Sequence, residues 1–162
     1  MKSLTWVAIS LFVMSTAIAN ANEIEGLRLG MTTAQVLKVA GEKGYTFSNP
    51  TKSGQNWTSY VLMKSGPVIS FCGDALASIG KSYDSNLHEL DNLVSQWAQN
   101  MGPPSEATAS QQFVEGSPLS DLSYNWHGDD NVRRHLGFFQ LGSRSAQVSY
   151  GYSYIKHPCR GP

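Results

Sequence analysis

Charged residues, cysteines and long apolar runs are all scarce in this chain. Only 15% of its 162 residues are Asp, Glu, Lys or Arg, and the formal net charge is zero. No block of like charges is present, so the composition argues against nucleic acid as a partner. The apolar run at residues 6–14 is shorter than the about 20 residues that a membrane-spanning helix needs. We therefore expect no stable membrane insertion.

The first 21 residues have the pattern of a secretory signal peptide. Lys2 supplies the positive start, the apolar run follows, and small residues at 17–19 or 19–21 form an A-x-A cleavage site. No cysteine lies near this site to accept a lipid. We expect residues 1–21 to be removed, which leaves 22–162 as one domain that is periplasmic or secreted.

Cysteine occurs only twice, at Cys72 and Cys159. An even pair in an oxidising compartment favours a disulfide, which would tie the short C-terminal tail to the middle of the chain. The alternative, a reactive thiol pair, lacks the Cys-x-x-Cys spacing. We therefore predict a bridge between Cys72 and Cys159.

Motifs that carry catalysis or metal binding are missing. The four histidines form neither an HExxH nor a His-x-His pattern. One of them, His127, lies near Asp129 and Asp130, and this group is either a metal or acid/base site or a solvated hairpin loop. We expect a protein that is not an enzyme, with no catalytic residues, no bound metal and no cofactor.

Two helices are predicted from their start and stop signals. Thr32 and Gln35 have the spacing of a capping box, and Gly44 ends the first helix. The second begins after Asn86 and ends at Gly102. Its apolar residues recur at helical spacing and predict a face packed in the core; they are Leu87, Leu90, Leu93, Val94, Trp97, Ala98 and Met101.

Short strands are predicted after each helix. They are expected at 45–48, 57–63, 68–72 and 75–83, and then at 111–115, 122–127, 132–141 and 146–155. Hairpin loops between them indicate antiparallel sheet. We therefore predict an α+β fold of two helix-plus-antiparallel-sheet repeats, about 26–84 and about 85–156, with the helices packed on one face of the sheet.

Aromatic and basic residues near the end of the chain are the best candidates for recognition. Tyrosines alternate in the last predicted strand, so they should share one face of the sheet, where they form either a binding surface or part of the core under the helices. Arginines of the preceding strand could line such a face or solvate an edge strand. The candidate protein-binding residues are Tyr150, Tyr152, Tyr154, Trp126, Arg133 and Arg134.

Residues 26–36, which read GLRLGMTTAQV, resemble the opening of the small outer-membrane lipoprotein family that includes SmpA/BamE. The order of elements is similar to the β-lactamase-inhibitor-protein-like fold of two tandem helix-plus-sheet repeats. The chain lacks the lipobox cysteine of those lipoproteins, and its second unit goes beyond their single one.

Taken together, these observations lead us to expect a non-enzymatic envelope protein that binds another envelope or secreted protein. An inhibitor or immunity-type protein of an envelope enzyme is the sharper form of that expectation. A structural or assembly factor of the cell envelope is the alternative. A small hydrolase built on His127 or Asp129 is a third possibility.

The signal peptide hypothesis predicts the N-terminus of the exported protein. Cleavage after the alanine at 19 or 21 gives a chain that starts at Asn20 or Asn22. Intact-mass spectrometry of the exported protein measures this directly. A mass that still includes Met1 would contradict the hypothesis.

Overall fold

The computed structural model describes residues 22–53, 56–114, 116–156 and 159. The predicted signal peptide and most of the C-terminal tail, His157 included, lie outside these residues. The described part is α+β, as expected, with helices α1 (Thr33–Glu42) and α2 (Leu87–Met101) and an eight-stranded antiparallel sheet. No helix in it is long and apolar enough to cross a membrane.

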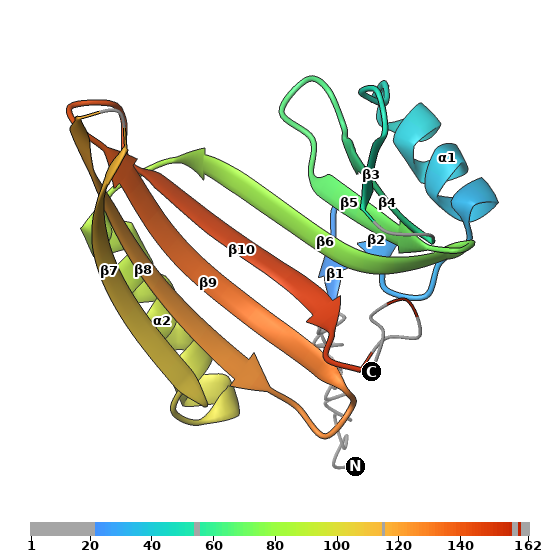
Figure 1. The fold of residues 1–162 in the computed structure, drawn as a ribbon. Coiled ribbons are helices and arrows are strands. Elements are labelled where there is room, and N and C mark those ends of the chain that lie inside the picture. The colour runs from blue at the N-terminus through green and yellow to red at the C-terminus, as the bar shows by residue number, and fades with distance from the viewer. Residues whose placement is uncertain (1–21, 54–55, 115, 157–158, 160–162) are drawn as a thin grey trace, which may run out of the picture.

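The strands form one small sheet and one large one (Figure 1). The small sheet pairs β1 (Glu23–Ile24) with β2 (Leu27–Arg28). The large sheet has the order β3-β4-β5-β6-β10-β9-β8-β7, so that β6 and β10 meet in its middle. Its strands are β3 (Thr51–Ser53), β4 (Trp57–Val61), β5 (Val68–Cys72), β6 (Ala75–Asp84), β7 (Glu106–Val114), β8 (Ser117–His127), β9 (Val132–Leu141) and β10 (Gln147–Tyr154).

Most predicted strands are confirmed, and the differences have local causes. The segment 45–48 is not a strand: the Tyr45 amide donates to the Ala40 carbonyl at 2.9 Å, which closes the end of α1, and Phe47 makes a single bridge to Leu62. β3 was not expected. β7 begins at 106 and not at 111, because pairing with β8 supplies hydrogen bonds that outweigh the weak strand preference of its alanines and glutamines.

Both helix starts are confirmed by their caps. The Gln35 amide donates to Thr32 Oγ1 at 3.3 Å, and the Thr32 amide donates to Gln35 Oε1 at 2.9 Å, which completes the capping box. The Glu89 amide donates to Asn86 Oδ1 at 3.1 Å. Gly102 follows α2 with φ of 81°, a conformation that favours glycine.

The core consists of two clusters. In the first, Val36 and Ala40 of α1 pack with Ile69 and Phe71 of β5 and with Leu76 and Ile79 of β6. The second lies under α2, which packs on β9 and β10, and its buried members are Leu90, Trp126, Leu136, Phe138 and Val148. Tyr150 packs against both clusters. Figure 1 looks onto the opposite face of the large sheet, with α2 behind the strands.

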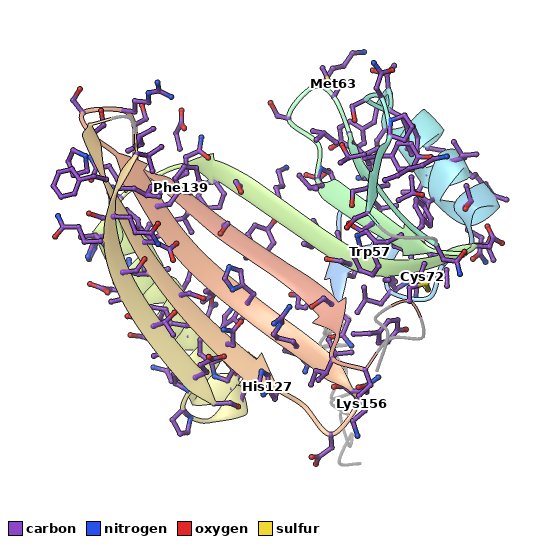
Figure 2. All side chains as sticks on the ribbon, in the orientation of Figure 1. Trp57, Met63, Cys72, His127, Phe139 and Lys156 are labelled. Atoms are coloured by element: carbon purple, nitrogen blue, oxygen red, sulfur yellow. A yellow bond between two sulfur atoms is a disulfide. The ribbon has the colours of Figure 1, made fainter. Side chains whose placement is uncertain are left out.

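The predicted disulfide between Cys72 and Cys159 is confirmed. The two Cα atoms lie 5.7 Å apart, and the cysteines are 87 positions apart in the sequence. Figure 2 shows Cys72 at the end of β5, near Trp57, which is its register partner on β4. The bridge thus joins the C-terminal tail to the far half of the sheet.

Removing the bridge should destabilise the fold. A cross-link over a separation of this length restricts the unfolded chain, and its loss in a secreted domain costs about 2–5 kcal/mol. We expect Cys159→Ser, and the parent after reduction with dithiothreitol, to lose that much free energy of unfolding in urea titrations. A midpoint unchanged by either treatment would contradict a stabilising bridge.

Candidate functional site

The predicted recognition residues divide between the two faces of the sheet. Tyr150, Tyr152 and Tyr154 share one face, as the period of two requires, and it is the face that carries α2. Arg134 belongs to this face too, because it is the register partner of Tyr152 on β10 and of Trp126 on β8. Arg133, one residue earlier, lies on the opposite face.

Trp126 is a core residue that supports its neighbours. Its side chain is 3% exposed, and its indole nitrogen donates to the Gly102 carbonyl at 2.9 Å. Trp97 of α2 packs edge-on against it, with ring centroids 5.4 Å apart. The other contact of Trp97 is a stack on Tyr152, with centroids at 6.2 Å and planes 10° apart. The three rings form one continuous aromatic block.

Beside this block lies a cleft of about 420 Å³, which we call the aromatic cleft. Tyr83 and Tyr150 meet in it as a T-shaped pair with centroids 6.3 Å apart. Five of its six lining side chains are half-buried, so parts of the rings stay accessible. The cleft is lined by Tyr83, Leu93, Trp97, Leu136, Tyr150 and Tyr152.

Burial raises the pKa values of two hydroxyl groups in the aromatic cleft. Burial is the largest cause that raises the pKa of Tyr83, followed by the charge of Glu89, and burial likewise raises the pKa of Tyr152. Both hydroxyls therefore remain protonated at neutral pH. The cleft combines apolar ring surface with hydroxyl groups that can donate hydrogen bonds, a combination found in binding pockets.

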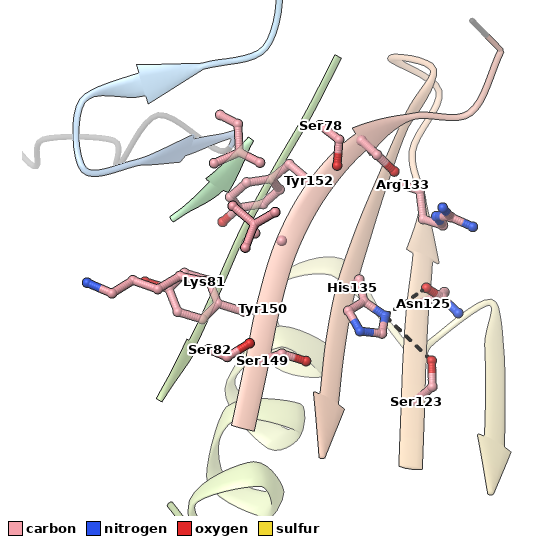
Figure 3. Close-up of a pocket in the computed structure, with 15 residues that line it drawn as sticks. Ser78, Lys81, Ser82, Ser123, Asn125, Arg133, His135, Ser149, Tyr150 and Tyr152 are labelled. Atoms are coloured by element: carbon pink, nitrogen blue, oxygen red, sulfur yellow. Dashed lines mark hydrogen bonds between the residues drawn. The ribbon is translucent and has the colours of Figure 1, made fainter. Parts of the chain in front are cut away.

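The opposite face carries a second hollow of about 440 Å³, which we call the polar groove (Figure 3). Arg133 lies here, from β9. Gly80 of β6 faces Gly151 of β10 in the register, and both line the groove. The polar side chains that line it include Ser78, Ser123, Asn125, Arg133, His135 and Ser149.

The protonation of His135 is set by its neighbours. Asn125 Nδ2 donates to Glu106 Oε2 at 3.3 Å, which leaves Asn125 Oδ1 to accept from His135 Nδ1 at 3.2 Å. Burial, and then the charge of Arg133, lowers the pKa of His135, while Asp121 acts in the opposite direction. In the neutral ring, Nδ1 therefore carries the proton, which leaves Nε2 able to accept a hydrogen bond.

Gly137 makes room for this imidazole. A Cβ atom on Gly137 would lie 2.8 Å from His135 Nε2 and 2.7 Å from Ser149 Oγ. Any larger residue would displace one of these side chains. A glycine inside a predicted strand is a signal of close approach, and it is the sequence feature that could have pointed to His135, which the sequence analysis did not place in a site.

The group around His127 is organised by an ion pair. Arg134 Nη2 lies 2.6 Å from Asp130 Oδ2, and Asp130 Oδ1 accepts from the Val132 amide at 3.1 Å. His127 and Asp129 are exposed. Among the described residues, no group of three or more His, Cys, Asp or Glu side chains could hold a metal ion.

Comparison with known proteins gives no relative. No family model matches this chain, and neither does any curated protein or any solved structure. The two hollows are therefore interpreted from their own residues.

The Asp130–Arg134 pair should make stability depend on pH in the acid range. The hydrogen bond from Arg134 holds the pKa of Asp130 below its ordinary value, so the stabilisation is present at neutral pH and is lost as the pH falls below about 4. We expect Asp130→Asn to lower the urea midpoint at pH 7, and the difference from the parent to shrink at pH 3. Asp129→Asn, at the exposed neighbour, is the control; equal effects of the two variants at pH 7 would contradict this assignment.

Proposed function

We propose that this chain is an exported domain that binds another envelope or secreted protein through its aromatic cleft, and that it is not an enzyme. An inhibitor or immunity-type protein of an envelope enzyme is the specific form that we favour. The observation that carries the proposal is the cleft itself, in which four aromatic side chains are only half-buried.

The chemistry of the aromatic cleft supports a protein partner. Half-buried Tyr and Trp side chains offer large apolar area with few rotatable bonds, and such residues dominate the binding energy of protein interfaces. Trp97 and Tyr152 are already stacked on each other, so little conformational entropy remains to be lost when a partner binds. An apolar or aromatic side chain of the partner is the group that fits against these stacked rings in the cleft.

The disulfide supports the proposed location. Cys72 and Cys159 are paired, and such bridges persist in oxidising compartments. Together with the signal peptide pattern at 1–21, this favours the periplasm or secretion over the cytoplasm.

We also infer that the fold consists of two related helix-plus-sheet units. Four antiparallel strands follow each helix, and the last strands of the two sets, β6 and β10, pair at the centre of the sheet. Register places Ile79, which packs with α1, opposite Tyr152, which stacks on α2. Because register partners point to the same face of a sheet, this pairing supports both helices lying on the same face.

Two matched variants test the binding role of the cleft. Tyr83 and Tyr124 are both half-buried and both pack against the second core cluster, but only Tyr83 lines the cleft. We expect Tyr83→Ala to reduce capture of the partner from periplasmic extract by about tenfold or more, as loss of an aromatic anchor does, while Tyr124→Ala leaves capture unchanged.

Thermal melting of both variants separates binding from stability. Both should melt below the parent by similar amounts, because each removes one packed ring. Equal capture by the two variants, or loss of capture that simply follows the loss of melting temperature, would contradict binding in the cleft.

A further inference from the structure

The two edges of the large sheet differ in how they are protected. One edge, β3, has three residues, and its central residue is the exposed Lys52. Short strands and lysine are two of the ways by which proteins prevent edge strands from pairing with other chains. The other edge, β7, has nine residues in regular register with β8.

β7 carries none of these protections. All nine of its residues are exposed, it contains no proline, and Glu106 at its start is its only charged residue. Phe113 is 75% exposed, far more than a phenylalanine outside an interface usually is. The outer row of N–H and C=O groups on such a strand is a template for one more strand.

We propose that β7 pairs antiparallel with β7 of a second copy of this chain, so that two sheets join into one. Ser110 is the midpoint of β7, and only a register centred on it pairs all nine residues. A two-fold axis then passes between the two Ser110 residues, as in the self-complementary interface of a symmetric dimer.

The side chains of β7 fit this register. On the face shared with α2, two pairs follow each other along the strand. Small Ala107 lies opposite large Phe113 of the second copy. Small Ala109 lies opposite large Gln111 of the second copy. On the other face, Ser110 meets itself. These three contacts thus place a small side chain against a larger one or join two hydroxyl groups.

The position of Glu106, the charged residue of β7, also favours antiparallel pairing. In the antiparallel register, Glu106 lies opposite Val114 of the other copy, so the two carboxylates are at opposite ends of the interface. Parallel pairing in register would place them side by side, which is unfavourable. Residues 22–162 have 11 basic and 12 acidic residues, so a formal net charge of only −1 adds little long-range repulsion between two copies.

The dimer would present both aromatic clefts on one side. A two-fold axis perpendicular to the joined sheet keeps the same face of each copy toward the same side. The polar grooves would likewise share the opposite side. The pairing stands on the edge strand alone and does not depend on what binds in either hollow.

Sedimentation equilibrium of the mature chain tests the proposal. We expect the parent to dimerise, and Ser110→Glu, which places two carboxylates at the two-fold axis, to raise the dimer dissociation constant by about tenfold or more. Thr51→Glu, the same type of change on the exposed β3 edge, should leave it unchanged. A parent that stays monomeric, or a dimer that Ser110→Glu does not weaken, would overturn the proposal.

A cysteine at the axis tests the register. Ser110→Cys should form an inter-copy disulfide on mild oxidation, seen as a doubled mass on a non-reducing gel, whereas Thr51→Cys should not. Urea unfolding of each variant confirms that the fold is retained. Cross-linking that is equal at both edges, or a smaller foreign chain bound at β7 in place of the second copy, would also overturn the proposal.

Discussion

The pairing of β6 with β10 is the constraint on which the rest of the structure depends. It joins strands from the two halves of the chain over seven residue pairs, and no other pair of strands in the large sheet connects those halves. Gly80 and Gly151 face each other within it, and a Cβ atom on Gly151 would lie 2.7 Å from the Ile79 carbonyl oxygen. Only glycine permits the backbones to approach this closely.

The same junction couples the two core clusters. Tyr150 touches both of them, and Tyr152 contacts α2 through Trp97 while it packs against the first cluster. Two packed tyrosines therefore connect the two halves of the molecule. The aromatic cleft is positioned by this contact, because the side chains that line it come from β6, β9, β10 and α2.

The sequence was most informative where local chemistry decides the structure. The caps at Thr32 and Asn86, the strand at 132–141 and the bridge between Cys72 and Cys159 follow from short-range signals or from simple counting. The extra length of β7 could not be predicted in this way, because the weak strand preference of its residues is overcome by β8 alone.

The candidate sites depend on pairing between strands, which no single segment specifies. The period of two placed Tyr150, Tyr152 and Tyr154 on one face, but only the register shows that α2 covers that face. The same period of two places the adjacent Arg133 and Arg134 of β9 on opposite faces. His135 was not predicted as a site residue, because its partner Asn125 lies on β8 and the partner of Asn125, Glu106, lies on β7. The pattern within one segment does not predict which distant strand it will pair with.

The position of the disulfide also determines what a protease can do to this molecule. Every peptide bond between Cys72 and Cys159 lies inside a covalent ring, which contains β6, α2 and all of β7 to β10. A single cut in one of the hairpin loops within the ring opens it without releasing a fragment. The nicked protein remains one covalent molecule, and the hydrogen bonds between β6 and β10 still hold the two new ends within the same sheet. One cleavage in this region would change the chain's connectivity but not its composition.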